Sequence, residues 1–145
     1  MKPLKIFVFL MFSVILSHAQ SLSHGLKNAF ETDDVMAFKN ALMQDKINLD
    51  SCLLLQDKPY SLLAISIRTG SVKILQDLIS VKVDVNKICD DKTPLMYAAK
   101  YGQLEAAKFL INAGSKIDLK NNEGKTALDY ARKYHKKEII DFLAK

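Results

Sequence analysis

Apolar residues recur every three or four positions in short stretches that are separated by polar and glycine-containing segments. Residues at i, i+3, i+6 and i+7 form one face of a helix about three turns long. Apolar side chains follow this spacing within residues 35–42, 72–79 and 104–111, and more loosely within 139–143. A second apolar segment closely precedes each stretch. The pattern therefore predicts a helix, a tight turn and another helix, repeated along the chain.

The chain also repeats itself at a spacing of 32 to 33 residues. Residues 93–102 read TPLMYAAKYG, residues 126–135 read TALDYARKYH, and residues 61–70 read SLLAISIRTG. A fainter copy, LKNAFETD, occupies residues 26–33. A repeat of this length is typical of stacked solenoid architectures, because a single unit cannot bury its apolar faces alone.

Local signals mark where each predicted helix begins and ends. Hydroxyl side chains precede the first helix of three copies, where they can accept a hydrogen bond from a free backbone N–H: Ser61, Thr93 and Thr126. Gly70 and Gly102 follow that helix, where a left-handed residue is needed, and Asp33 and His135 take the glycine position in the other copies. Residues 83–86 and 116–119 favour β-structure and are expected to form the arms of hairpin fingers.

On these residues the chain resembles the ankyrin-repeat family. The motif is nearly complete in DKTPLMYAAKYGQLEAAKFLINAGSKID, which begins at Asp91, although Met96 and Asp129 stand where the family often has histidine. The resemblance covers residues 23–145 and implies an all-α ankyrin solenoid with short β-hairpin fingers. Four repeats are expected, at about 23–56, 57–89, 90–121 and 122–145, within a domain of residues 20–145.

Proteins of this family bind partners on the concave surface that the fingers and first helices form. The resemblance implies a non-catalytic module that binds a partner protein, such as an inhibitor, immunity-type or protective protein. The family's variable surface positions, carried over to this chain, include nine basic or tyrosine residues that we expect to bind the partner: Lys58, Tyr60, Arg68, Lys92, Lys100, Tyr101, Lys125, Lys133 and Tyr134. Tyr101 and Tyr134 form the best pair, because they hold the same position in successive repeats and tyrosine is favoured in interfaces.

Residues 1–19 have the pattern of a secretory signal peptide. Lys2 and Lys5 precede the apolar run 6–16, and Ala19 ends a small-residue cleavage site. The alternatives are an uncleaved anchor, although eleven apolar residues are few for a bilayer span, and a buried helix. Cleavage after Ala19 predicts an exported, periplasmic or secreted protein without a membrane span. We also expect a monomer.

The distribution of charge suggests the nature of the partner. Loss of Lys2 and Lys5 lowers the net charge from +5 to +3. Residues 100–145 hold ten basic and six acidic side chains, whereas residues 20–99 hold nine and ten. This basic end predicts a partner with an acidic surface. An anionic envelope polymer bound by the basic C-terminal groove is the alternative, while export argues against nucleic acid.

Catalytic, metal and cofactor motifs are weak. Residues 123–126 end like a phosphate-binding loop, but Leu119 stands where its first glycine belongs. His24 and His135 have no nucleophile or carboxylate at a catalytic spacing. We therefore expect no catalytic, metal or cofactor-binding residues. Cys52 and Cys89 lack companion ligands for zinc and are either a disulfide or two separate thiols.

Overall fold

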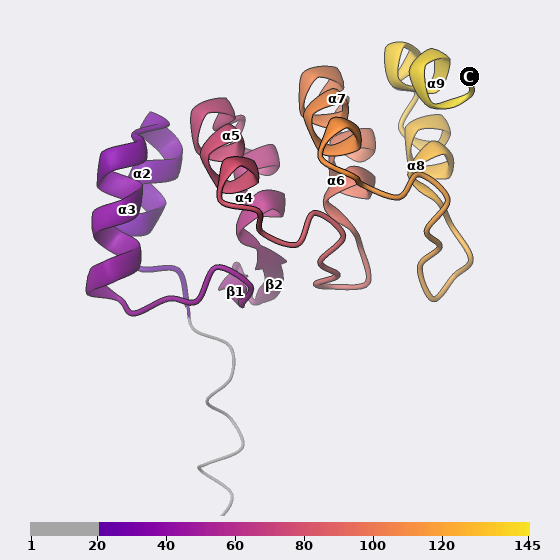
Figure 1. Ribbon diagram of the computed structural model, residues 1–145. Coiled ribbons are helices and arrows are strands. Elements are labelled where there is room, and N and C mark those ends of the chain that lie inside the picture. Colours follow the sequence, from indigo (N-terminus) through magenta and orange to yellow (C-terminus); the bar gives the residue numbers. More distant parts are fainter. Residues whose placement is uncertain (1–20) are drawn as a thin grey trace, which may run out of the picture.

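The computed structural model describes residues 21–145, which form four helix pairs stacked in sequence order (Figure 1). The predicted signal peptide of residues 1–19 lies outside the described residues. The pairs are α2 (His24–Thr32) with α3 (Val35–Gln44), α4 (Leu62–Thr69) with α5 (Val72–Ser80), α6 (Pro94–Tyr101) with α7 (Leu104–Asn112), and α8 (Ala127–Lys133) with α9 (Lys137–Leu143). Each pair falls within one of the four ranges expected for a repeat. The prediction of a mostly helical solenoid is thus confirmed.

The first helix of every pair begins at a hydroxyl side chain. Ser23, Ser61, Thr93 and Thr126 each accept a hydrogen bond from the backbone N–H three residues later. Asp129 completes the last of these caps, because its carboxylate accepts from both the N–H and the hydroxyl of Thr126, at 2.9 and 3.0 Å. The aspartate that replaces the family's histidine therefore still makes a side-chain hydrogen bond at this helix start.

The first helices end in the left-handed conformation that the sequence predicted. Gly70 and Gly102 have φ angles of 75° and 71°, which cost glycine no Cβ clash. Asp33 and His135 adopt φ angles of 51° and 54° at the same point of the first and last pairs. All four positions reverse the chain within a few residues, so the second helix of each pair packs against the first.

Three fingers project from one side of the stack, before α4, α6 and α8 (Figure 1). The first is a hairpin of β1 (Cys52–Leu55) and β2 (Lys58–Ser61). In the second, Cys89 pairs with Lys92. Positive φ angles at the two tip residues of both fingers, Gln56–Asp57 and Asp90–Asp91, match the tight two-residue turns of hairpins. In the third, a backbone bond joins Asn121 and Lys125.

The expectation that residues 83–86 and 116–119 form hairpin arms was wrong. Both segments are turns or irregular structure that follow the second helices α5 and α7. The Asn86 N–H instead donates to the carboxylate of Asp84, and the Lys116 N–H donates to the side-chain oxygen of Asn86, both at 2.9 Å. β-propensity depends strongly on context, and in both segments side-chain hydrogen bonds to the backbone replace a strand ladder.

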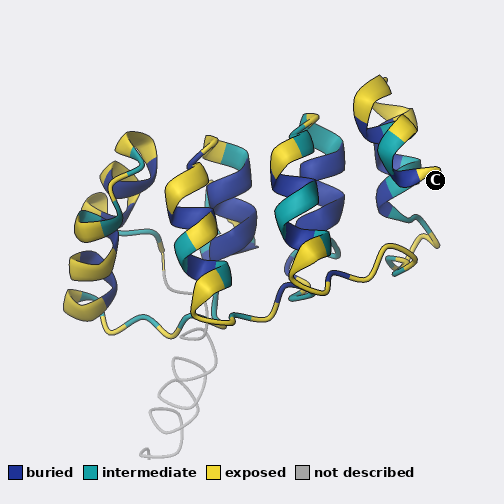
Figure 2. Cartoon of the chain, turned by 45° about the horizontal axis from the view of Figure 1, so that its top comes forward, coloured by how far each residue is buried: buried dark blue, intermediate teal, exposed yellow. Residues whose placement is uncertain are grey.

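The core is concentrated on the first helices of the middle pairs. Residues 62–67 of α4 and 94–99 of α6 are buried on every face, whereas α3, α5 and α7 each have one exposed side (Figure 2). Each middle first helix packs against its own partner helix and against the first helices of both neighbouring pairs, and α4 also contacts β2. The last turn of each is less buried, and Arg68 and Lys100 are partly exposed there; Lys133, at the same position of α8, is exposed.

Polar contacts join successive pairs. Asp33 accepts hydrogen bonds from the backbone N–H groups of Lys73 and Ile74, both at 3.0 Å, and so caps α5 from the preceding pair. Gln103 donates to the Ile67 carbonyl at 3.0 Å. At the fingers, the Asn122 N–H donates to the Asp91 carboxylate at 2.9 Å. These contacts fix how one pair is oriented on the next.

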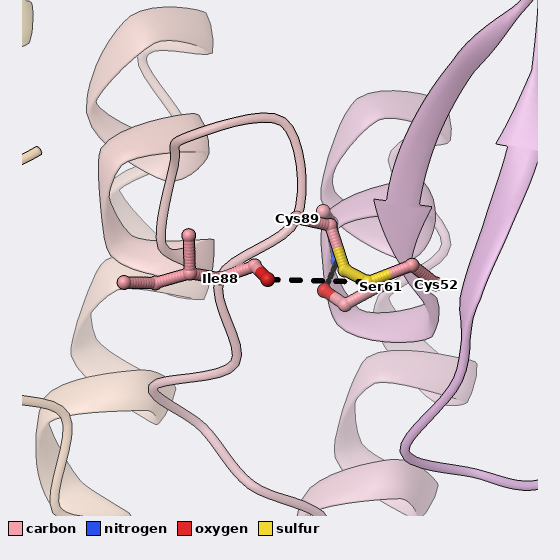
Figure 3. Close-up of a disulfide and its surroundings, with 5 residues drawn as sticks. Cys52, Ser61, Ile88 and Cys89 are labelled. Atoms are coloured by element: carbon pink, nitrogen blue, oxygen red, sulfur yellow. Dashed lines mark hydrogen bonds between the residues drawn. A yellow bond between two sulfur atoms is a disulfide. The ribbon is translucent and has the colours of Figure 1, made fainter. Parts of the chain in front are cut away.

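A disulfide links the first two fingers. The structure joins Cys52, at the start of β1, to Cys89, with their Cα atoms 6.0 Å apart (Figure 3). This separation lies within the range that disulfide geometry allows. Ser61 and Ile88 flank the bond in Figure 3, and Cys52 stands opposite Ser61 in the hairpin register. The bond therefore connects segments 37 residues apart in the chain.

Candidate partner-binding surface

Tyrosines alternate with cations along the first helices and the adjacent finger residues. We call this set the tyrosine–cation row: Tyr60, Arg68, Lys92, Tyr97, Lys100, Tyr101, Lys133 and Tyr134. Arg68, Lys100 and Lys133 each stand seven residues after the N-cap of α4, α6 and α8. Because the helix pairs stack in register, equal positions in the repeat become neighbours in space.

Tyr101 and Tyr134 lie on either side of one lysine. The Lys100 ammonium is 5.4 Å from the centroid of Tyr101 and 5.5 Å from that of Tyr134, and Lys133 lies 5.7 Å from Tyr134. These are cation–π distances. The expected neighbourhood of Tyr101, Tyr134 and their lysines is therefore present. Tyr134 is 37% exposed, whereas Tyr101 is partly buried and packs against the core.

Tyr97 connects the row but was not among the predicted site residues. Its ring is 1% exposed, lies 5.3 Å from Tyr60 and stacks on Tyr101 at 6.4 Å with an interplanar angle of 11°. The i, i+4 spacing of Tyr97 and Tyr101 in one helix was the signal that could have revealed this contact. Through Tyr97, the two middle repeats share a continuous aromatic contact.

Tyr60 was expected to face a partner, but its ring is only 4% exposed. It belongs to the core and holds Arg68 in place. The Arg68 guanidinium donates to the Tyr60 hydroxyl at 2.5 Å and to the Gln56 side-chain carbonyl at 2.7 Å. The pleat of β2 directs Tyr60 inward because alternate residues of a strand point to opposite faces. Arg68 is the member of this pair that a ligand can reach.

The three finger lysines differ in their surroundings. Lys92 lies 5.9 Å from the Tyr97 centroid and 3.6 Å from the Asp90 carboxylate. Lys58 is exposed on β2, and Lys125 is half-buried beside Asn121. Among the described residues, neither Lys58 nor Lys125 lies over a tyrosine ring. The structure thus joins Lys92 to the row and leaves the other two at the fingers.

The row is electropositive. Within residues 21–145, no carboxylate oxygen lies within 4.0 Å of the charged groups of Arg68, Lys100 or Lys133. Burial is the main reason why the pKa of Tyr97 is raised well above its ordinary value, and Tyr60 and Asp90 add to this effect. Tyr97 is therefore a neutral phenol at physiological pH. The row offers positive charge and aromatic area.

The described residues contain no cluster of three or more His, Cys, Asp or Glu side chains arranged to hold a metal ion. None of the helices in this part of the chain combines the length and the apolar composition needed to cross a bilayer.

Comparisons with known proteins agree with this architecture. The family model described as ankyrin repeats (3 copies) matches residues 37–145. The E3 ubiquitin-protein ligase hecd-1 of Caenorhabditis elegans is 31% identical over 116 residues, which are 80% of this chain and 4% of that protein. The Transient receptor potential cation channel subfamily A member 1 homolog of the same organism is 40% identical over 80 residues, 54% of this chain and 7% of the relative.

A bacterial protein also matches. A putative ankyrin repeat protein of Rickettsia bellii is 31% identical over 91 residues, which are 58% of this chain and 54% of that protein. The chain spans between 4% and 54% of the length of these three relatives. The similarity therefore concerns the repeats and does not extend over whole proteins.

Proposed function

The chain belongs to the ankyrin-repeat family, and on that premise we propose that it is a non-catalytic binding protein whose tyrosine–cation row receives an acidic partner protein. Ankyrin repeats generally mediate protein–protein interaction and are typically non-catalytic. An inhibitor, immunity-type or protective role fits a small module of this kind. The partner's contact surface combines an apolar spot with surrounding carboxylates.

The observation that carries the proposal is the placement of Lys100 between Tyr101 and Tyr134. A lysine held over two aromatic rings loses less side-chain freedom on binding than a lysine that extends into water. Tyrosine and arginine are enriched at binding hot spots because they combine large contact area with polar ends. Arg68, Lys100 and Lys133 have no carboxylate partner among the described residues, so a partner's carboxylates need not displace one.

A pull-down from extracts of the producing cells tests this proposal. The immobilised protein is compared with a variant that combines Tyr134→Ala, Lys100→Gln and Lys133→Gln. We expect the variant to bind a retained protein at least 30-fold more weakly, the equivalent of ~2 kcal/mol for hot-spot loss. Tyr101 is left intact because it stacks on the buried Tyr97, and its truncation would also disturb folding.

A variant with Lys73→Gln and Lys116→Gln serves as the control. Lys73 is exposed on α5, and Lys116 is exposed in the segment that follows α7. It loses as many lysines as the binding variant and should retain the partner. If the same protein is captured equally well by the tyrosine–lysine variant, binding does not use the row, and the fingertips become the next surface to test.

The same proposal places the protein in an oxidising compartment outside the cytoplasm. The apolar run of residues 6–16 behind Lys2 and Lys5 supports export, and a disulfide between Cys52 and Cys89 is stable mainly in such compartments. An intact mass that begins at Gln20 in the exported fraction is the expected result. A product that retains Met1 in the membrane fraction would contradict export.

A further inference from the structure

The turn between α8 and α9 concentrates positive charge. Residues 132–137 read Arg-Lys-Tyr-His-Lys-Lys, and we call them the basic turn. His135 reverses the chain with a φ angle of 54°. Backbone bonds from His135 to Arg132 and from Lys136 to Ala131, at 3.1 and 2.9 Å, hold the reversal. Several cations therefore project from one ordered bend at the end of the stack opposite the fingers.

Most of these cations lack an acidic partner. Only Lys137 is paired, with Asp141 at 2.7 Å, among the charged groups that the structure describes in the basic turn. Asp129, one turn earlier on α8, is engaged by Thr126. Glu138 follows the turn directly but has no carboxylate–cation contact within 4.0 Å in residues 21–145. Within residues 21–145, Arg132, Lys133 and Lys136 thus have no carboxylate within 4.0 Å. The Thr126 hydrogen bonds are the main reason why the pKa of Asp129 is lowered, and Arg132 is near enough to that carboxyl to add to this effect.

Lys136 is held in position by the preceding repeat. Its side chain crosses Gly102 so closely that a Cβ on residue 102 would lie 2.8 Å from the Lys136 Cδ. Beside it is a shallow hollow of about 220 Å³, lined by Gly102, His135, Lys136, Lys137, Glu138 and Ile139. The basic turn is therefore a surface with a fixed shape, and part of its charge is anchored against α6.

The composition of the basic turn distinguishes between classes of partner. Among the described residues, the cations of the basic turn outside the tyrosine–cation row lie over no tyrosine ring, and lysine without such an anchor is depleted in protein–protein interfaces. Nucleic-acid strands bind by stacking bases on open aromatic faces. Tyr134, the turn's aromatic residue, already has Lys100 and Lys133 over its ring. The basic turn thus presents positive charge but no free aromatic face on which a base could stack. Such a surface suits a flexible polymer that carries many anionic groups.

We infer that the basic turn binds an acidic polysaccharide, whose sulfate or carboxylate groups accept hydrogen bonds from Arg132 and Lys136. Release of counterions from such a polymer supplies the affinity, as it does for other polyanions. Arg132 and Lys136 lie outside the tyrosine–cation row. The inference therefore stands or fails separately from the proposed protein partner.

The test measures binding of the full chain to dextran sulfate and to polygalacturonate, with neutral dextran as the uncharged reference. Binding to at least one anionic polymer and not to dextran is expected. The variant Arg132→Gln with Lys136→Gln should bind about tenfold more weakly at low salt, with a shallower salt dependence because fewer counterions are released. The Lys73→Gln, Lys116→Gln control, which removes the same charge, should stay within about twofold of the parent.

Three results would overturn the inference. The first is the absence of binding to either anionic polymer, and the second is an equal loss in the two double variants, which would mean that net charge alone acts. The third is binding of a single-stranded oligodeoxythymidine as tight as that of dextran sulfate. Thermal unfolding of both variants near the parent's midpoint establishes that the losses do not come from misfolding.

Discussion

At the scale of single residues, Tyr97 combines two opposed effects. Its ring contributes to the core through contacts with Tyr60 and Tyr101, whereas its hydroxyl is buried without a hydrogen-bond partner among the described residues. Burial of an unpaired hydroxyl costs free energy because the group loses its bond to water. Tyr130 holds the same repeat position on α8, but there the hydroxyl accepts a bond from Asn121 at 3.0 Å.

Replacement of Tyr97 by Phe is therefore expected to leave the free energy of unfolding unchanged or to raise it by up to ~1 kcal/mol, because the substitution removes only the unpaired group. Tyr130→Phe is the matched control and should lower stability, since it breaks a bond. Urea unfolding at neutral pH measures both. A clear loss of stability in Tyr97→Phe would mean that the hydroxyl has a partner in solution.

The raised pKa of Tyr97 adds a pH dependence with a defined sign. Above pH ~10 the unfolded chain ionises this tyrosine while the folded chain keeps it protonated. The unfolded state then binds fewer protons, so the free energy of unfolding falls as pH rises. In Tyr97→Phe this fall should be smaller over the same pH range.

At the scale of elements, the turns between paired helices contain two glycines with similar φ angles and different neighbours. Substitutions at these glycines can therefore distinguish the cost of backbone strain from the cost of a steric clash. Gly70 and Gly102 both end a first helix in the left-handed conformation. A Cβ on residue 70 would meet only the Gln103 amide, at 3.9 Å, whereas one on residue 102 would meet Lys136 at 2.8 Å. The two positions thus have similar backbone strain and different surroundings.

Gly70→Ala is expected to lower the free energy of unfolding by ~1–2 kcal/mol from backbone strain. Gly102→Ala should cost about 1 kcal/mol more, because the Lys136 side chain must also move. A double-mutant cycle with Lys136→Ala should remove that excess. Chemical denaturation measures both variants. Equal decreases in the free energy of unfolding would show that the Lys136 side chain moves aside at no cost.

At the scale of the whole molecule, the disulfide crosslinks the two central repeats of the stack. It joins the finger before α4 to the finger before α6, and these two helices pack against each other in the centre of the solenoid. In a repeat protein each unit is stabilised mainly by its neighbours. A crosslink between central repeats therefore limits the separation of the two halves.

Reduction of this bond is expected to lower the free energy of unfolding by ~3–4 kcal/mol, since the bond closes a long loop in the unfolded chain. The comparison uses urea unfolding with and without reductant. The variant Cys52→Ala with Cys89→Ala provides the control, because its unfolding should not respond to reductant. Two free thiols in the native protein, found by quantitative labelling, would contradict the bond.

The sequence alone determined the features that depend on near neighbours in the chain. Helix starts at Ser61, Thr93 and Thr126, and left-handed ends at Gly70 and Gly102, follow from contacts within a few residues. The repeat then predicted the stacking of helix pairs, because identical units bury identical faces. The pairing of Tyr101 with Tyr134 followed from the same register.

Only the tertiary structure decided what depends on the distance between repeats. It buried Tyr60, inserted Tyr97 between Tyr60 and Tyr101, and set Lys100 over two rings. It also brought Cys52 within bonding distance of Cys89, and selected residues 52–61 instead of 83–86 for a hairpin. Local propensity cannot fix these outcomes, because each one depends on how closely separate repeats approach and on which side chains fill the space between them.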